Sequence, residues 1–209
     1  MSHLNSPNPP HFIITLNKVD ILTLSGVITS SLAIVAALSG AIYLCTSLLF
    51  LAMLADALDG ILARKFKLER PFGRYLDGFM DTLIYLVAPT LALYVYGFDG
   101  LWALALWPVL ICGSIRLAVF NDIGNIQESN GLAYLGMPVF WSVFILAGFL
   151  LLEFVLPQRL VYGALAVILS LFSYAMIIRR PFFKFKKLSH ILCLTIGNSL
   201  LFLLLHLSR

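Results

Sequence analysis

The fold is decided by residues 42–81, which read IYLCTSLLFLAMLADALDGILARKFKLERPFGRYLDGFMD. The stretch up to Ala55 is almost wholly apolar, which is typical of a helix that crosses a bilayer. Four aspartates follow, two on each side of a short basic loop. Ionisable side chains inside spanning segments are costly and by default indicate function. The stretch therefore predicts two antiparallel membrane helices whose acidic faces meet near one membrane surface.

The composition of the whole chain also indicates a membrane protein. Of its 209 residues, 61% are hydrophobic and 11% are charged, and the mean hydropathy is +0.98. Soluble domains carry roughly a quarter charged residues, so this chain cannot cover a globule of its size with polar surface. A soluble enzyme, a disordered chain and a secreted disulfide scaffold are excluded. The net charge of +4 comes from cations in short loops, which indicates membrane topology rather than nucleic-acid binding.

Six apolar stretches are long enough to cross a hydrocarbon core, which takes about 20 residues per helix. They are residues 20–40, 42–64, 73–96, 99–121, 136–156 and 159–178. A seventh stretch, 189–207, includes Asn198 and either spans the membrane or lies in its interface. We therefore expect an all-α, polytopic bundle of six transmembrane helices with a possible seventh C-terminal helix. The expected divisions are a polar arm at 1–18, a membrane domain at 19–188 and an added apolar helix at 189–209.

Two clusters of cations predict the orientation, because cytoplasmic loops are enriched in Lys and Arg. The first cluster is Lys65, Lys67, Arg70 and Arg74, and the second is Arg179, Arg180, Lys184, Lys186 and Lys187. Six spans that begin in the cytoplasm place both clusters on the cytoplasmic side. We therefore expect a multi-pass protein of the inner membrane whose acidic site faces the cytoplasm. The second cluster is interpreted as an anchor to anionic lipid, with phosphate binding as the alternative.

The acidic group consists of Asp56, Asp59, Asp77 and Asp81. The spacings i,i+3 and i,i+4 place each pair on one helix face. Two unit charges about 4 Å apart repel by about 4 kcal/mol at an effective dielectric near 20, so protons or divalent cations must neutralise the group. Carboxylate ligands suit Mg²⁺, Mn²⁺ or Ca²⁺. No His or Cys lies in residues 56–81, which argues against zinc.

Glycines accompany these acids at positions 60, 73 and 78. Small residues in membrane helices either permit close packing of two helices or let a ligand approach the backbone. Because four carboxylates and Arg64 stand beside them, we favour a ligand.

The pattern has eight fixed positions, which are Asp56, Asp59, Gly60, Ala63, Arg64, Gly73, Asp77 and Asp81. In identity and spacing it resembles the signature of the CDP-alcohol phosphotransferase family. The resemblance implies transfer of a phosphatidyl or related group from CDP-diacylglycerol, or a related CDP-lipid, to a small alcohol, with release of CMP. It implies two divalent cations, Mg²⁺ or Mn²⁺, held by the four aspartates. Asp81 would also be the catalytic general base for the acceptor hydroxyl.

The resemblance also implies residues that bind the nucleotide and its phosphates. These are Gly60, Ala63, Arg64 and Gly73, with Arg64 on phosphate. Two readings of Asp20 and Thr23 stay open, because this pair either caps the first helix or faces the nucleotide, as a polar residue followed three later by Thr often does in the family. A homodimer in the lipid bilayer is expected from the same resemblance, and the placement of the cations in short loops predicts no nucleic-acid partner.

Three further segments resemble the phosphatidylserine synthase branch of this family. Residues 116–121, RLAVFN, resemble its Arg-Leu-Ala-Arg-Phe-Asn, with Val119 in place of the second arginine. Residues 135–138, LGMP, resemble its Gly-Leu-Pro segment, and residues 180–184, RPFFK, resemble its Pro-x-Phe-Lys ending. The resemblance implies L-serine as the acceptor, bound by Arg116 and Asn121. The alternatives are that Arg116 snorkels to the headgroups and that Asn121 ends its helix.

Other functions compete with transfer to serine. The same reaction with glycerol 3-phosphate, inositol phosphate or choline is the nearest alternative, and a phosphorylated acceptor needs a basic pocket near Asp81, which the 179–187 loop is able to supply. A membrane cation transporter is the distant alternative. It predicts acids spread through the membrane depth and inverted repeats, whereas the acids here crowd at one end and no repeat is visible.

Overall fold

A computed structural model describes residues 13–124, 126–128, 131–182 and 188–208. Most of the polar arm expected at 1–18 lies outside these residues, as do Lys184, Lys186 and Lys187 of the second cation cluster.

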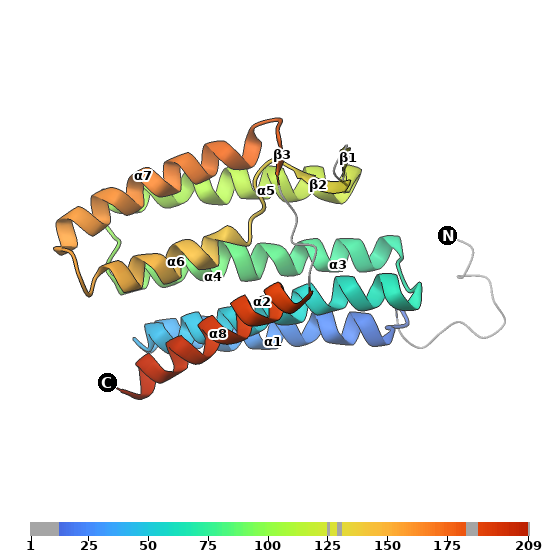
Figure 1. Ribbon diagram of the computed structural model, residues 1–209, viewed down its shortest axis with the longest axis horizontal. Coiled ribbons are helices and arrows are strands. Elements are labelled where there is room, and N and C mark those ends of the chain that lie inside the picture. The colour runs from blue at the N-terminus through green and yellow to red at the C-terminus, as the bar shows by residue number, and fades with distance from the viewer. Residues whose placement is uncertain (1–12, 125, 129–130, 183–187, 209) are drawn as a thin grey trace.

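The described residues form eight α-helices with short connections. They are α1 (Lys18–Leu38), α2 (Ile42–Phe66), α3 (Pro71–Asp81), α4 (Ala88–Tyr96), α5 (Leu106–Ile123), α6 (Trp141–Leu152), α7 (Gln158–Ile177) and α8 (Leu188–Leu207). A π-helical segment, η1 (Thr82–Val87), joins α3 to α4, and a 3₁₀ turn, η2 (Trp102–Ala105), leads into α5. Figure 1 shows the helices side by side along the long axis of the molecule.

Six helical segments are long and apolar enough to cross a membrane. They are Lys18–Leu38, Ile42–Phe66, Pro71–Tyr96, Trp102–Ile123, Gln158–Ile177 and Leu188–Leu207. The predicted all-α, polytopic membrane fold is therefore confirmed. The starts of α1 and α3 and the ends of α2 and α5 lie at the same end of the bundle (Figure 1), and the four aspartates are close to that end.

Three short strands follow α5 and α7 in the chain. They are β1 (Ile126–Glu128), β2 (Gly131–Leu135) and β3 (Pro181–Phe182), which pair antiparallel in the order β1-β2-β3. Leu135 pairs with Pro181 and Tyr134 with Phe182. The last two segments that suggested a phosphatidylserine synthase are therefore neighbours in space, apart from Phe183 and Lys184, which are outside the described residues.

The fifth predicted span, 136–156, is wrong in its extent, because only Trp141–Leu152 is α-helical in α6. Gly136 has φ +75°, and a Cβ at this position would overlap the carbonyl oxygen of Met176. The N–H of Gly136 donates to the Arg180 carbonyl at 2.9 Å, and that of Met137 donates to the Ala175 carbonyl at 2.9 Å. These bonds hold the chain extended against the end of α7, so the helix begins later than its hydropathy predicts.

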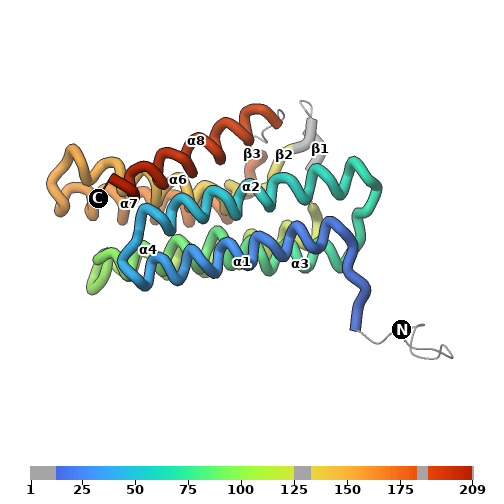
Figure 2. Tube along the Cα trace, turned by 90° about the horizontal axis from the view of Figure 1, so that it is seen from below, coloured from blue at the N-terminus to red at the C-terminus, as the bar shows by residue number. Residues whose placement is uncertain are grey.

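The seventh apolar stretch forms α8, a helix of spanning length that lies along α2 (Figures 1 and 2). The Ser47 hydroxyl donates to the Ser199 carbonyl at 2.9 Å. Phe202 is fully buried, with its ring 6.2 Å from those of Tyr43 and Phe50. Small polar contacts and close aromatic packing are how helices associate inside a membrane.

The third span is one rod with a widened turn in its middle. The N–H of Ala88 donates to the carbonyl of Leu83, five residues earlier, as in a π-helix. Pro89 accounts for the widening, since proline has no N–H and its ring clashes with the carbonyl four residues before it, which here is that of Tyr85. A π-turn is one of the known ways in which a helix accommodates such a conflict.

Candidate active site

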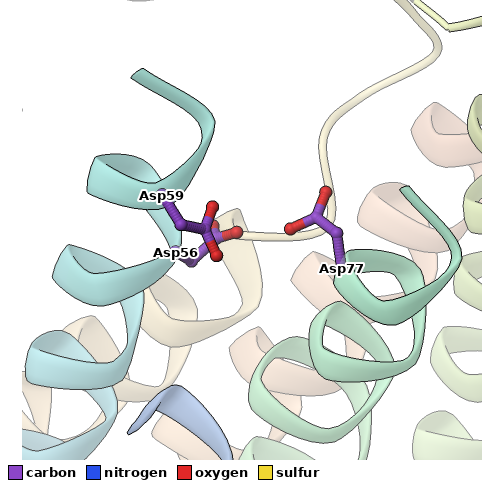
Figure 3. A group of neighbouring side chains, drawn as sticks. All are labelled: Asp56, Asp59 and Asp77. Carbon is purple, nitrogen blue, oxygen red and sulfur yellow. The ribbon is translucent and has the colours of Figure 1, made fainter. Parts of the chain in front are cut away.

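Three of the aspartates converge between α2 and α3. Asp56, Asp59 and Asp77 each offer a carboxylate oxygen, and these three oxygens lie within 4.8 Å of one another. Figure 3 shows Asp77 facing Asp56 and Asp59 across the space between the two helices. α1 packs against both α2 and α3, and the αL residue Lys67 ends α2 just before Pro71 starts α3. The two acidic faces therefore meet, as the spacing predicts.

Asp81 lies one turn further along α3 than Asp77 and is 9% exposed. It is within electrostatic range of the other three aspartates and of Arg116. Among the described residues, Oδ1 of Asp77 and Oδ1 of Asp81 are buried without a hydrogen-bond partner. Buried polar atoms normally have partners, so these two oxygens require a cation, a proton or a ligand.

Two hydroxyl groups from other helices hold the aspartates of α2. The Thr23 hydroxyl, from α1, donates to Oδ2 of Asp59 at 2.5 Å, and the Tyr85 hydroxyl, from η1, donates to Oδ2 of Asp56 at 2.5 Å. Tyr85 is absent from the residues that the sequence predicted for the site. The sequence places it four residues after Asp81, but the direction of its side chain depends on the π-helical segment η1.

Asp20 takes part in the cap of α1. The side chain of Asn17 accepts from the N–H of Asp20 at 2.9 Å, and Asp20 accepts from the N–H of Asn17 at 2.7 Å. Arg70 forms an ion pair with Asp20 and donates to the Thr15 carbonyl at 3.0 Å. Asp20 therefore caps its helix, whereas Thr23 bonds Asp59 instead.

A cavity of about 520 Å³ opens beside the aspartates, which is within the size range of small-molecule sites. Every residue that the resemblance connected with the nucleotide lines it: Asp20, Thr23, Gly60, Ala63, Arg64 and Gly73. Asp59 and Asp77 lie in its wall, together with Arg70 and Arg74. The cavity therefore presents carboxylates, which attract cations, next to guanidinium groups, which attract phosphate.

Arg116 is 5% exposed, the opposite of a side chain that snorkels to the headgroups. Its guanidinium carbon lies 5.0 Å from the centre of the Phe120 ring and 5.4 Å from that of Tyr134, and within the described part of the chain its Nε has no partner. Burial raises the pKa of Tyr134, which is in β2 and outside the spans, to about 12. The Tyr134 phenol is therefore neutral at physiological pH.

Asn121 does not end its helix, because α5 continues to Ile123 and Gly124 follows with φ +70°. Asn121 lines the cavity. Its Oδ1 is buried and lacks a hydrogen-bond partner in the residues described. The structure thus places Asn121 in the cavity wall, whereas Arg116 is outside the lining and within electrostatic range of Asp81.

The site fits divalent cations by the chemistry of its donors. Within the described part of the chain, the clustered ligands are the carboxylate oxygens of Asp56, Asp59 and Asp77, and Mg²⁺ and Mn²⁺ prefer such oxygens. The buried Oδ1 atoms of Asp77 and Asp81 lack hydrogen-bond partners among the described residues, so they also offer acceptor positions for a cation or a proton.

Comparison with known proteins gives a consistent result. The family model for CDP-alcohol phosphatidyltransferase matches residues 16–179. The CDP-diacylglycerol–serine O-phosphatidyltransferase of Bacillus subtilis is 34% identical over 123 residues, which are 56% of this chain and 66% of that protein. The protein of the same name from Methanocaldococcus jannaschii is 30% identical over 159 residues, 76% of this chain and 70% of that protein.

A relative with another acceptor in its name is also similar. The phosphatidylcholine synthase of Rhizobium meliloti is 29% identical over 158 residues, 72% of this chain and 63% of that protein. The chain spans 63% to 70% of the length of these three relatives. α8 lies beyond the residues that the family model matches.

Proposed function

Because the chain belongs to the CDP-alcohol phosphatidyltransferase family, we propose that it transfers a phosphatidyl group from CDP-diacylglycerol, or a related CDP-lipid, to the hydroxyl of L-serine. CMP is the leaving group. The convergence of three aspartates within 4.8 Å beside a cavity lined by arginines is the observation that carries this proposal.

The four aspartates would hold two divalent cations, Mg²⁺ or Mn²⁺. When bound, such ions neutralise a pyrophosphate and stabilise the leaving nucleotide. The chain itself orients the donor. Gly60 and Gly73 leave room for the nucleotide beside the backbone, and Arg64 pairs with phosphate.

Asp81 is the general base in this proposal. The serine oxygen forms a bond to the phosphorus of the phosphatidyl group while the bond from that phosphorus to the CMP oxygen breaks. The proton of the serine hydroxyl passes to Asp81, whose Oδ1 has no donor among the residues described. Because Asp81 is buried, bulk water does not compete with the serine hydroxyl for its carboxylate.

Serine is favoured over choline by the surroundings of Arg116. A guanidinium with an unpartnered Nε is suited to the serine carboxylate. Choline carries a permanent positive charge, and aromatic faces usually bind it. Here the nearby faces of Phe120 and Tyr134 already lie against the Arg116 guanidinium, which repels a second cation.

We place the site at the cytoplasmic face of the inner membrane. Lys65 at the end of α2 and Lys67 and Arg70 in the loop to α3 carry positive charge, and such loops remain on the cytoplasmic side. The lipid tails of the donor then stay in the bilayer while the nucleotide enters from the cytoplasm. A homodimer stays a prediction, which the mass of the purified protein in nanodiscs tests.

The test is release of CMP from CDP-diacylglycerol by the purified protein in nanodiscs, with Mg²⁺ or Mn²⁺ and one alcohol at a time. L-serine, choline, glycerol 3-phosphate and inositol phosphate form the panel. We expect release with L-serine, abolished by a chelator. Release with another acceptor alone would contradict serine and leave the family reaction standing, whereas no release with any acceptor would contradict the proposed activity.

A further inference from the structure

The Tyr85 hydroxyl reaches the acidic group from within an apolar run. Tyr85 is 2% exposed, and its hydroxyl donates to Asp56 at 2.5 Å. The charges of Asp77 and Asp81 are also within its electrostatic range. Neither the family signature nor the cavity lining includes Tyr85, so its contacts are what define its role.

The widened turn of the third span aims Tyr85 at Asp56. In a regular α-helix each step of four residues advances a side chain by about 40°. Over the two steps from Asp77 through Asp81 to Tyr85, this drift adds up to about 80°. A π-turn holds more residues than an α-turn, so η1 reverses part of the drift and returns Tyr85 toward the face of the aspartates.

The cause of this widening lies one turn further along. Pro89 cannot donate to the carbonyl of Tyr85, and a regular α-helix would force its ring against that carbonyl. Pro89 therefore causes the widened turn η1, and η1 sets the direction of the Tyr85 side chain. The Tyr85 hydroxyl in turn holds the carboxylate of Asp56.

We propose that Tyr85 is a positioning residue for Asp56, set in place by the π-turn that Pro89 imposes. One lone pair of Asp56 is occupied by the hydroxyl, and rotation of the carboxylate is restricted. The other lone pairs then stay available to a cation shared with Asp59 and Asp77. Removing a residue that hydrogen-bonds a metal ligand typically weakens metal affinity 10- to 100-fold. The inference rests on the cation site of the proposed function.

A purely structural role is the competing explanation, because buried tyrosine hydroxyls generally need an acceptor. The two explanations differ in what they predict for binding of the metal alone. Loss of a structural bond lowers the melting temperature, whereas loss of a positioning bond also weakens the cation site.

The experiment measures binding of Mn²⁺ alone to the 209-residue chain in detergent micelles by electron paramagnetic resonance. For Tyr85→Phe we expect affinity about 10-fold weaker than that of the wild type. The apparent KM for Mn²⁺ in CMP release should rise with it, while the KM for CDP-diacylglycerol stays the same. The matched control is Tyr162→Phe, which removes a hydroxyl that bonds Gln158 at 3.0 Å, far from the aspartates. This control should bind Mn²⁺ as the wild type does.

Pro89→Ala provides a second, independent variant. It lets the third span return to a regular α-helix, so we expect weaker Mn²⁺ binding here too. In this background Tyr85→Phe should weaken binding little further, because the hydrogen bond from Tyr85 to Asp56 is already lost. If folded Tyr85→Phe binds Mn²⁺ like the wild type, the positioning role is wrong while the cation site stands. If the wild type binds no Mn²⁺, the cation site is wrong and this inference falls with it.

Discussion

The side-chain amide of Asn121 packs directly on Gly78, so closely that a Cβ at position 78 would overlap it. Gly78 follows Asp77 on α3, and Asn121 is on α5 in the wall of the cavity. A single glycine therefore decides how near α5 comes to the acidic face of α3. Because Gly78 has no side chain, the Asn121 amide is able to lie next to the aspartates.

Gly78→Ala should lower activity strongly because the new methyl group pushes Asn121 out of its position. Helix propensity would by itself favour alanine by about 1 kcal/mol, so a loss of activity cannot be attributed to a weaker helix. Initial rates of CMP release at saturating donor measure the effect. The matched control is Gly163→Ala on α7, where no described atom lies within 4 Å of the added Cβ; this variant should retain its activity.

Thr23→Val should reduce activity, because it keeps the shape of the side chain and removes the donor to Asp59. Hydrogen bonds to charged groups contribute about 1.5–3 kcal/mol, which corresponds to a loss of about 10-fold or more. Thr23→Ser keeps the hydroxyl and should recover most of the rate. Equal rates for the valine and serine variants would contradict a role for this bond.

The order of the apolar helices was predictable, because the hydropathy of a stretch of about 20 residues depends on its local sequence alone. The spacing of Asp56, Asp59, Asp77 and Asp81 also predicted which carboxylates share a face. The late start of α6 was not predictable in this way, since it depends on Gly136 meeting the end of α7, a contact between segments about 40 residues apart. A hydropathy window does not contain such a contact.

Tyr85 was missed for a related reason. In the sequence it is one more aromatic residue in an apolar run, and its direction depends on the response of the helix to Pro89. The proline was visible, but a proline permits a kink, a break or a π-turn, and packing against α1, α5 and α6 decides among them. The residues of the motif can therefore be predicted from the sequence, whereas the residues that orient them are identified only once the fold is known.

Phe202→Ala should destabilise the protein without changing its specificity for the acceptor. The ring is fully buried between α8 and α2, where it stacks with Tyr43 and Phe50. Deleting a buried phenylalanine costs about 3–5 kcal/mol in protein cores, and the melting temperature in detergent should fall accordingly. The control is Leu204→Ala, an exposed position on the same helix. An altered acceptor preference in Phe202→Ala would show that α8 acts on the site itself.

Arg116→Gln should raise the KM for L-serine while leaving the KM for CDP-diacylglycerol close to that of the wild type. Glutamine keeps hydrogen-bonding capacity but lacks the charge that pairs with a carboxylate, so a loss of about 10-fold or more in kcat/KM for serine is expected. Arg159→Gln, at the exposed start of α7, is the control. Because the pKa of Tyr134 is about 12, that phenol adds no titration to the serine KM between pH 6 and pH 9. An unchanged KM for serine in Arg116→Gln would remove this arginine from acceptor binding.

Asp81→Asn should abolish turnover while the protein still folds and binds donor. The amide has nearly the shape of the carboxylate and cannot accept the proton of the acceptor hydroxyl, and general-base catalysis typically contributes 10²–10⁴-fold to the rate. Asn has one fewer charge in a group of four carboxylates, so the melting temperature without metal should be unchanged or higher. CMP release and thermal unfolding of the same preparation measure both effects. The comparison variant is Asp99→Asn, which changes an aspartate between α4 and α5, outside the acidic group, and should behave as the wild type. If the rate of Asp81→Asn stays within about 10-fold of the wild-type rate, the loss is smaller than that range. Such a result would mean that another group accepts the proton.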